Sequence, residues 1–149
     1  QFKEDIRKTF SNSEIYDFFH LNKTILLFLL QEKLILPENL LKNNDDSYQA
    51  FFYPEIESKI DEYKKSVLFE NFEELKLYYN SKEFDQKRQI GENDSYICSL
   101  IRNDSIEEFI QYVNKQNLSL FNTKIKNSIF ETNLILKERK VSLTEYSID

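Results

Sequence analysis

Residues 94–113 read DSYICSLIRNDSIEEFIQYV, and apolar residues recur in them at the spacing of two short helices. The first helix would turn three apolar residues inward: Ile97, Leu100 and Ile101. The second would bury four: Ile106, Phe109, Ile110 and Val113. The stretch therefore predicts a pair of amphipathic helices that pack against each other.

A minimal turn separates these two helices. Asn103-Asp104 supplies polar turn residues, and Asp104 and Glu107 have the spacing of a capping box, which would satisfy free amides at a helix start. Two short antiparallel helices joined in this way are the building unit of an α-solenoid. Because the hairpins do not recur at a clean fixed period, the pattern alone indicates helical hairpins and no particular repeat family.

The first third of the chain has the same build. Ser11 and Glu14 again have capping-box spacing, and Asn22 is a candidate N-cap for a helix over residues 23–33. The centre of that helix, residues 25–30, is apolar all round. We therefore expect neighbouring elements to cover it on more than one side.

The middle of the chain is also mainly helical. Pro37 suits the first turn of a short helix over residues 38–42. Residues 48–54 are aromatic, and we predict irregular backbone there. A long helical stretch follows over residues 55–79, and its two apolar stripes are rotated relative to each other, which indicates a break near residues 67–70.

The best candidate boundary lies at residues 80–93, which are polar and contain the only Gly. We predict an N-terminal helical region over residues 1–79, a polar connector at 80–93 and a C-terminal helical region over 94–149. The chain begins with Gln1, contains no Met, and stops in what reads as the first turn of a helix. We therefore expect it to be a piece of a longer protein.

Five stretches together resemble a family found in protists: residues 53–56, 72–74, 87–114, 128–133 and 142–146. The family is a domain of unknown function that precedes ankyrin repeats, in ankyrin proteins greatly expanded in some flagellated, anaerobic parasitic protists. The resemblance covers residues 48–149 well and residues 1–47 more loosely, through residues 22–35.

The resemblance implies an all-α fold of helix-turn-helix pairs, stacked as a divergent ankyrin-like α-solenoid. Residues 141–147 would then open a degenerate ankyrin repeat, in which only Leu143 of the Thr-Pro-Leu-His signature is kept, Thr144 replaces the His and Tyr146 replaces a small residue. Ankyrin proteins bind other proteins through their repeat surface, so the resemblance also implies protein partners or a capping role at one end of the array.

The composition excludes several classes of function. One Gly cannot build a Walker A loop or a dinucleotide fingerprint, and one Cys can form neither a disulfide framework nor a cysteine zinc cluster. Twenty Lys and Arg against 26 Asp and Glu give a net charge of −6, which disfavours nucleic acid as a partner. The longest apolar run, residues 25–30, is too short to span a bilayer. A single Cys and no targeting segment favour the cytoplasm.

Candidate chemical groups are few. His20, the only His, could be a catalytic base, but we interpret it as a turn residue between two helices because no nucleophile lies near it in sequence. Cys98 could be a reactive thiol, but its place on a short amphipathic helix favours burial. The polar loop Asn43–Ser47 contains Asp45 and Asp46, but lacks the Gly and Glu of a calcium-binding EF-hand loop.

A group of carboxylates could in principle serve hydrolysis: Glu55, Glu57, Asp61 and Glu62. They are interleaved with Lys59, Lys64 and Lys65, which is typical of a salt-bridged helix face. The sequence therefore predicts no catalytic residue, no cofactor, no metal and no small-molecule ligand.

Thirteen Phe and nine Tyr exceed what a small core requires. Five of them lie at the edges of the helical stretches: Phe51, Phe52, Tyr53, Tyr78 and Tyr79. They are a candidate interaction surface, because Tyr and Phe are enriched at the centres of interfaces. The alternative is packing within the core and between helices, with Phe filling volume that Ala and Met fill elsewhere.

These observations favour a non-catalytic protein–protein interaction or scaffold module, the N-terminal part of an ankyrin-type solenoid. The alternative is a structural component of a large cytoskeletal or axonemal, microtubule-associated assembly. An uncharacterised enzyme is the third hypothesis, and no catalytic constellation supports it.

Overall fold

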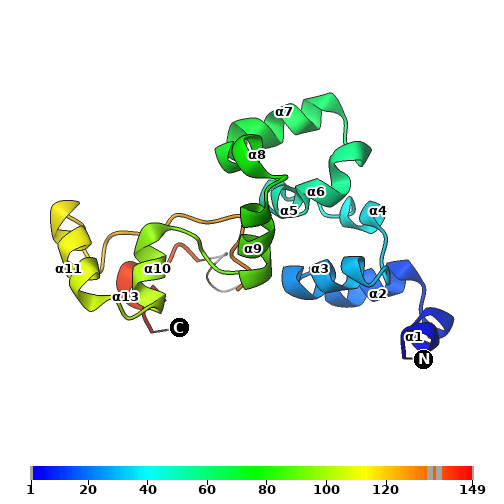
Figure 1. Ribbon diagram of the computed structural model, residues 1–149, viewed down its shortest axis with the longest axis horizontal. Coiled ribbons are helices and arrows are strands. Elements are labelled where there is room, and N and C mark those ends of the chain that lie inside the picture. Colours follow the sequence, from blue (N-terminus) through cyan, green and yellow to red (C-terminus); the bar gives the residue numbers. More distant parts are fainter. Residues whose placement is uncertain (1, 134–135, 137–138, 149) are drawn as a thin grey trace. The chain divides into compact units, whose positions relative to one another are not determined.

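Helices dominate the computed structural model, which describes residues 2–133, 136 and 139–148 (Figure 1). Within those residues the backbone forms no β-strand, and one isolated antiparallel bridge joins Lys124 to Ser142. The predicted all-α class is therefore confirmed. The chain divides into two compact units, Gln1–Ile90 and Gly91–Asp149, which are described one at a time.

Unit 1 is a succession of short helices. They are α1 (Phe2–Thr9), α2 (Asn12–Phe19), α3 (Lys23–Gln31), α4 (Pro37–Leu40), α5 (Asp46–Phe51), α6 (Tyr53–Ile56), the 3₁₀ turn η1 (Glu57–Lys59), α7 (Glu62–Asn71), α8 (Glu73–Tyr78) and α9 (Lys82–Ile90). Helix α9 lies within residues 80–93, the stretch predicted as a connector, and the division between the units falls directly after it.

The N-terminal signals of these helices are present as predicted. Ser11 and Glu14 form a reciprocal capping box at the start of α2. The side chain of Asn22 accepts a hydrogen bond from the Ile25 amide at the start of α3. Pro37 occupies the first turn of α4, where its missing N–H costs nothing. Local sequence therefore sets where these helices begin.

Two predictions for the middle of unit 1 were wrong. Residues 48–54 are helical rather than irregular, because Asp45 caps α5 and Pro54 sits in the first turn of α6. The stretch 55–79 contains three separate helical segments after α6, and the main break falls at Phe72, whose φ of −132° and ψ of 87° interrupt the helix. The apolar stripes suggested one long helix, but local caps and the burial of aromatic side chains divide this region into short helices.

Three helices end in a left-handed residue that is not Gly. Lys33, Asp104 and Asn117 have φ values of 57°, 51° and 51° and follow α3, α10 and α11. After α10, for example, the Ser105 amide donates to the Leu100 carbonyl and the Asp104 amide to the Ile101 carbonyl, the two bonds of a Schellman motif. Asp104 thus ends α10 instead of capping the next helix, and the predicted capping box with Glu107 does not form.

The core of unit 1 is built from aromatic and branched side chains. Phe51 and Phe52 pack edge to face with ring centroids 4.8 Å apart, and Tyr53 meets Tyr79 in the same way at 4.7 Å. Leu26, Leu40 and Ile56 are fully buried around α5 and α6. The apolar centre of α3 is covered on one side only, since Ile25 and Phe28 face solvent, so the expectation of cover on more than one side was wrong.

Two charged side chains of unit 1 are buried, Lys23 of α3 and Arg88 of α9, and the Lys23 ammonium lies 4.9 Å from the centroid of the Phe51 ring. Arg88 of α9 is 4% exposed and donates to Glu55 at 2.7 Å, to Asp85 at 2.6 Å and to the Phe51 carbonyl at 3.3 Å. Its guanidinium group also lies over the rings of Phe51 and Phe84. A buried charge of this kind is tolerated because both terminal nitrogens have acceptors and the guanidinium lies over ring faces, although its Nε has no hydrogen-bond partner among the described residues.

Unit 2 contains α10 (Tyr96–Arg102), α11 (Ile106–Lys115) and α13 (Leu143–Tyr146). Its core is small and centres on Cys98, Ile125, Val141, Leu143 and Tyr146. A polar network supports it: the Glu131 carboxylate, which is buried, accepts from the Asn93 and Asn133 amides. Arg102 connects this polar network to the core, because it donates to the Asn93 carbonyl of the network and to the Tyr146 hydroxyl of the core.

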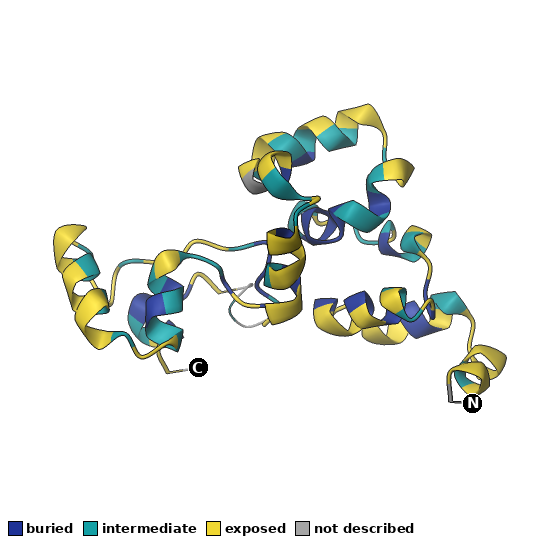
Figure 2. Ribbon diagram, in the orientation of Figure 1, coloured by how far each residue is buried: buried dark blue, intermediate teal, exposed yellow. Residues whose placement is uncertain are grey.

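Helix α11 departs most from prediction. None of its residues is fully buried. Ile106 is 66% exposed and Ile110 53%, whereas Phe109 and Val113 are half-buried. Figure 2 shows the contrast, with α5 dark blue and α11 largely yellow. The predicted burial of four apolar residues was therefore wrong for two of them: the main packing partner of α11 is α10, and Ile106 and Ile110 stay exposed.

Candidate functional site

The best-formed hollow of unit 2 is a cleft of about 320 Å³ between α11, the end of α10 and α13. Its apolar lining comes from six residues: Leu100, Ile101, Ile106, Phe109, Leu120 and Leu143. Four polar residues complete it: Asp104, Ser105, Thr144 and Ser147. The volume is at the lower end of the range of roughly 300–1,000 Å³ that is usual for ligand pockets.

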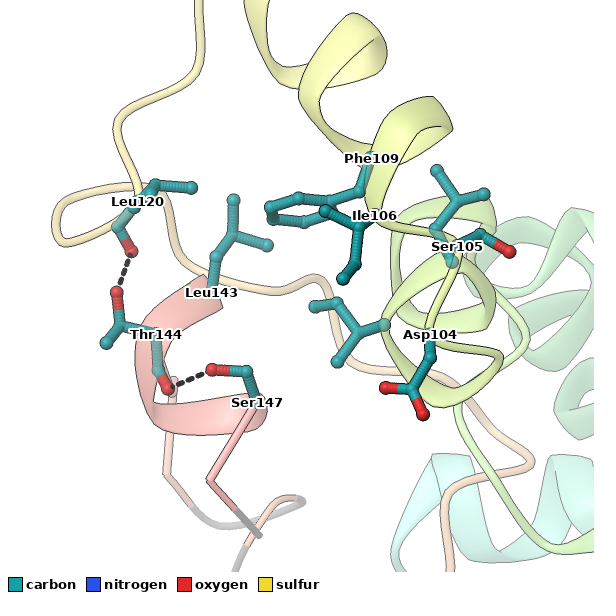
Figure 3. Close-up of a pocket in the computed structure, with 10 residues that line it drawn as sticks. Asp104, Ser105, Ile106, Phe109, Leu120, Leu143, Thr144 and Ser147 are labelled. Carbon is teal, nitrogen blue, oxygen red and sulfur yellow. Dashed lines mark hydrogen bonds between the residues drawn. The ribbon is translucent and has the colours of Figure 1, made fainter.

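Side chains from three segments meet across the cleft. Figure 3 shows Ile106 and Phe109 projecting from α11 toward Leu143 of α13 and Leu120 of the intervening loop. Leu143 is buried and forms the floor, whereas Ile106 stands at the open rim. The cleft is therefore continuous with the exposed apolar side of α11.

Backbone hydrogen bonds hold the wall formed by residues 118–123. The Thr144 hydroxyl donates to the Leu120 carbonyl at 3.1 Å, and the Thr144 amide donates to the same oxygen at 3.2 Å. The Leu143 amide donates to the Thr123 carbonyl at 3.3 Å. This wall presents Leu120 to the cleft, and the next residue, Phe121, is 75% exposed.

Helix α13 is fixed by its own capping box, which positions Leu143 at the cleft floor. The Ser142 amide donates to the Glu145 carboxylate at 2.6 Å, and the Glu145 amide donates to the Ser142 hydroxyl at 3.2 Å. The Ser142 amide is the main cause that lowers the pKa of Glu145 to about 2, and the nearby Lys124 ammonium adds to it. The Ser-x-x-Glu spacing at 142–145 is visible in the sequence and could have predicted this helix start.

Acidic side chains gather at one end of the cleft. Asp104 is part of its lining, and Glu107 and Glu108, which do not line it, occupy the first turn of α11. All three side chains are exposed, and none has an ion-pair partner in the part of the chain that the structure describes. The adjoining cations are engaged elsewhere, since Arg102 pairs with Glu92 at 2.6 Å and Lys124 with Glu145 at 3.4 Å.

The aromatic residues predicted as an interaction surface lie elsewhere, in unit 1. Phe51, Phe52 and Tyr53 are 0% exposed, so for these three the surface prediction was wrong and the packing alternative is correct. Burying large aromatic area stabilises the fold more than any exposed contact would. Burial also raises the pKa of Tyr53 to about 12.

Tyr78 and Tyr79 remain half-exposed. The Tyr79 hydroxyl donates to Glu57 at 2.7 Å, which raises the pKa of that Tyr. The Lys87 ammonium lies 5.0 Å from the centroid of the Tyr78 ring. Both Tyr side chains therefore take part in contacts within unit 1, and their role toward a partner stays a prediction.

The groups weighed as catalytic have structural surroundings. His20 is exposed at the end of α2, and its Nδ1 lies 2.8 Å from the Asp17 carbonyl, which is the turn position predicted for it. Cys98 is buried, as predicted, and burial raises the pKa of its thiol. A raised pKa keeps the thiol protonated and unreactive at neutral pH.

The carboxylates of the 43–62 region also have individual partners. Asp45 and Asp61 cap α5 and α7, and Asp46 pairs with Lys64 at 2.7 Å. Glu55 holds Arg88, Glu57 accepts from Tyr79, and Glu62 pairs with Lys65. Across the described residues, no three His, Cys, Asp or Glu side chains gather in a way that could hold a metal. Within that same part of the chain, no helix is both long and apolar enough to cross a bilayer.

Comparison with known protein families, with curated proteins and with solved structures finds no match for this chain. The resemblance to the protist family therefore stays a prediction, and a proposal for function rests on the geometry of the site. Its most informative feature is the cleft with the open apolar side of α11, which sequence reasoning missed. The amphipathic pattern of α11 was visible, but nothing in the sequence marks an apolar side that lacks a cover.

Proposed function

We propose that the chain is a non-catalytic protein-interaction module, and that α10 and α11 form a solenoid-type helix pair in the N-terminal part of an ankyrin-like array. The observation that carries the proposal is the α11 surface, defined here as Ile106, Phe109 and Ile110 together with Leu120 of the cleft wall. Exposed apolar side chains that adjoin a preformed cleft are typical of protein-binding sites.

The helix pair itself supports the solenoid part of the proposal. Helices α10 and α11 pack together through contacts that include Tyr96 and Tyr112, with ring centroids 5.2 Å apart. In stacked-repeat proteins each helix pair buries one side against its neighbour and keeps another for the next repeat or the partner. An α11 that packs mainly on α10 and keeps Ile106 and Ile110 exposed fits such a unit.

The non-catalytic part rests on the surroundings of the reactive groups. The His20 ring nitrogen faces a backbone carbonyl, the Cys98 thiol is buried with a raised pKa, and the carboxylates near α7 each serve a cap, an ion pair or a hydrogen bond. None of these groups lines the cleft.

A pull-down with the full chain tests the proposal. The Ile106→Ser/Ile110→Ser double variant should lose the specific partners that the unaltered chain retains, because it removes the apolar part of the α11 surface. Leu77→Ser is the matched control, since Leu77 is an equally exposed apolar residue, at 72%, in the other unit. Partners that are indifferent to the double variant, or lost equally with Leu77→Ser, would overturn the proposal.

A permanent structural component of a larger assembly is the second candidate. A specific observation favours it: unit 1 also presents apolar side chains to solvent, among them Phe18, Leu21 and Phe28 of α2, α3 and their turn. Obligate assembly parts bury large apolar surfaces on several sides. Light scattering on the isolated chain distinguishes the two, because an assembly part should self-associate or precipitate and an independent module should stay monomeric.

A further inference from the structure

The surroundings of the α11 surface are charged in a way that restricts what can cover it. Asp104 lines the cleft at the N-terminal end of α11, and Glu107 and Glu108 lie in the first turn of the same helix without lining the cleft. The helix dipole favours negative charge in the first turn, so folding keeps Glu107 and Glu108 there without a cation. The only cation of α11 is Lys115, at the opposite end of the helix.

These three carboxylates form an acidic rim at one end of the apolar groove, and such a rim selects partners by charge. A partner that brings Lys or Arg to this rim gains a charge pair at each contact, and one that brings Asp or Glu meets repulsion. The apolar stripe from Ile106 to Ile110 spans about one turn of α11, roughly 6 Å along its axis, which matches one to two turns of a partner helix. A helix that lies in a groove places its apolar residues at i, i+3 and i+4.

We infer that the α11 surface binds an amphipathic, basic helical segment of a partner protein, with its apolar side on Ile106, Phe109 and Ile110 and its Lys or Arg residues at Asp104, Glu107 and Glu108. This inference rests on the proposed function and adds the chemistry of the partner. A large apolar side chain of that segment would enter the 320 Å³ cleft above Leu143.

A second copy of this chain fits the same surface less well. Two α11 helices packed in opposite directions would set one Lys115 against three carboxylates. The chain also carries a net charge of −6, which opposes self-association. A basic helix offers more charge pairs at the same rim.

The test uses the full chain and a designed probe, a fluorescein-labelled helical peptide with a Leu stripe flanked by Lys. A matched peptide carries Glu in place of each Lys. Fluorescence anisotropy should show the Lys peptide binding at least about tenfold more tightly than the Glu peptide at about 0.05 M salt, with a smaller ratio at about 0.3 M because salt screens the rim charges. Equal binding of both peptides would overturn the inference.

Variants of the rim give the sharper result. Glu107→Lys/Glu108→Lys should weaken the Lys peptide by about tenfold or more and strengthen the Glu peptide, because the charge of the rim is reversed. Asp104→Asn keeps a residue that tolerates the left-handed turn and should weaken the Lys peptide by a few-fold. Circular dichroism of each variant shows whether the fold is retained. Charge reversal without effect, in a folded variant, would overturn the inference.

The outcome remains distinguishable from failure of the proposed function. If partner capture depends on Ile106 and Ile110 but charge reversal changes nothing, the proposed interaction function is supported and the inference of a basic helical partner is overturned. If sedimentation velocity shows a dimer that Ile110→Ser disrupts, the occupant is a second copy and the inference is also overturned. If no partner depends on the α11 surface, the proposed function itself fails.

Discussion

Helices α5 and α6 of unit 1 and helix α11 of unit 2 are similarly apolar in sequence, yet they have opposite roles in the folded chain. Phe51, Phe52 and Tyr53 are fully enclosed, whereas Ile106 and Ile110 face solvent. The difference comes from the packing around each region: several helices of unit 1 surround α5 and α6, whereas α10 is the main packing partner of α11 in the described part of unit 2. An apolar pattern therefore identifies the side of a helix that is favourable to bury. Only the surrounding fold shows whether other elements of the chain bury it.

The largest expected effect separates the two regions directly. Phe51→Ala removes a fully buried ring that also lies under Arg88, and should lower the free energy of unfolding by about 3–5 kcal/mol. Ile110→Ala should change it by less than about 0.5 kcal/mol, because Ile110 is already half in water. Urea denaturation followed by circular dichroism measures both. A cost at Ile110 close to that at Phe51 would show that α11 is covered.

The ion pairs of the two units offer a second comparison. Glu55→Gln removes the more buried of the two carboxylates that pair with Arg88, whose own side chain is 5% exposed, and should cost about 2–3 kcal/mol of unfolding free energy. Glu92→Gln removes the partner of Arg102, which is considerably more exposed, and should cost less than about 1 kcal/mol. Equal costs in urea denaturation would contradict the view that the Arg88 ion pair is enclosed and the Arg102 ion pair is not.

The capping box of α13 predicts a pH dependence within unit 2. The pKa of Glu145 is lowered to about 2 in the folded chain from an ordinary value of 4.5, so the stabilisation is fully present above pH 4.5 and is lost as the pH falls toward 2. Ser142→Ala should cost about 1 kcal/mol at pH 7.

Hydrogen exchange at the Tyr146 amide, which bonds to the Ser142 carbonyl, measures this effect locally. Exchange should accelerate between pH 4.5 and 2 beyond its intrinsic rate in the unaltered chain. In Glu145→Gln, the matched control, this extra acceleration should be absent. The same pH response in both proteins would mean that another group causes it.

The left-handed helix ends give the smallest expected effect. Lys33→Gly should stabilise unit 1 by up to about 1 kcal/mol, because a side chain with a β-carbon is disfavoured at a φ of 57°. Asp104→Gly should stabilise unit 2 by less, since Asp tolerates this conformation better than Lys. Thermal unfolding of the two variants ranks them. Destabilisation by Lys33→Gly would show that the Lys33 side chain makes a contribution that outweighs its backbone strain.

Prediction from the sequence succeeded where the signal is local. The Ser11–Glu14 box, the Asn22 cap and Pro37 were all placed correctly, because each depends on residues within one turn. Prediction failed where tertiary surroundings act. Asp104 was interpreted as a cap for α11, but the need to close α10 places it in the left-handed position instead.

The candidate site was the least predictable part. The sequence marks Ile106 and Phe109 as members of an apolar helix side, and it marks Phe51 and Tyr53 as conspicuous aromatics. Which set faces solvent depends on how many helices pack around each, and periodicity carries no information about that number. The acidic residues of the rim are present in the sequence, but the sequence does not show that a cleft lies beside them.

The most direct test of this account is solvent exposure of the isoleucine methyl groups in the full chain, measured by NMR with a soluble gadolinium chelate. The account predicts strong relaxation enhancement for Ile106 and Ile110, close to that of the exposed Ile148, and little for the buried Ile56. Protection of Ile106 and Ile110 to the level of Ile56 would contradict it, because α11 would then have no open apolar side to offer a partner.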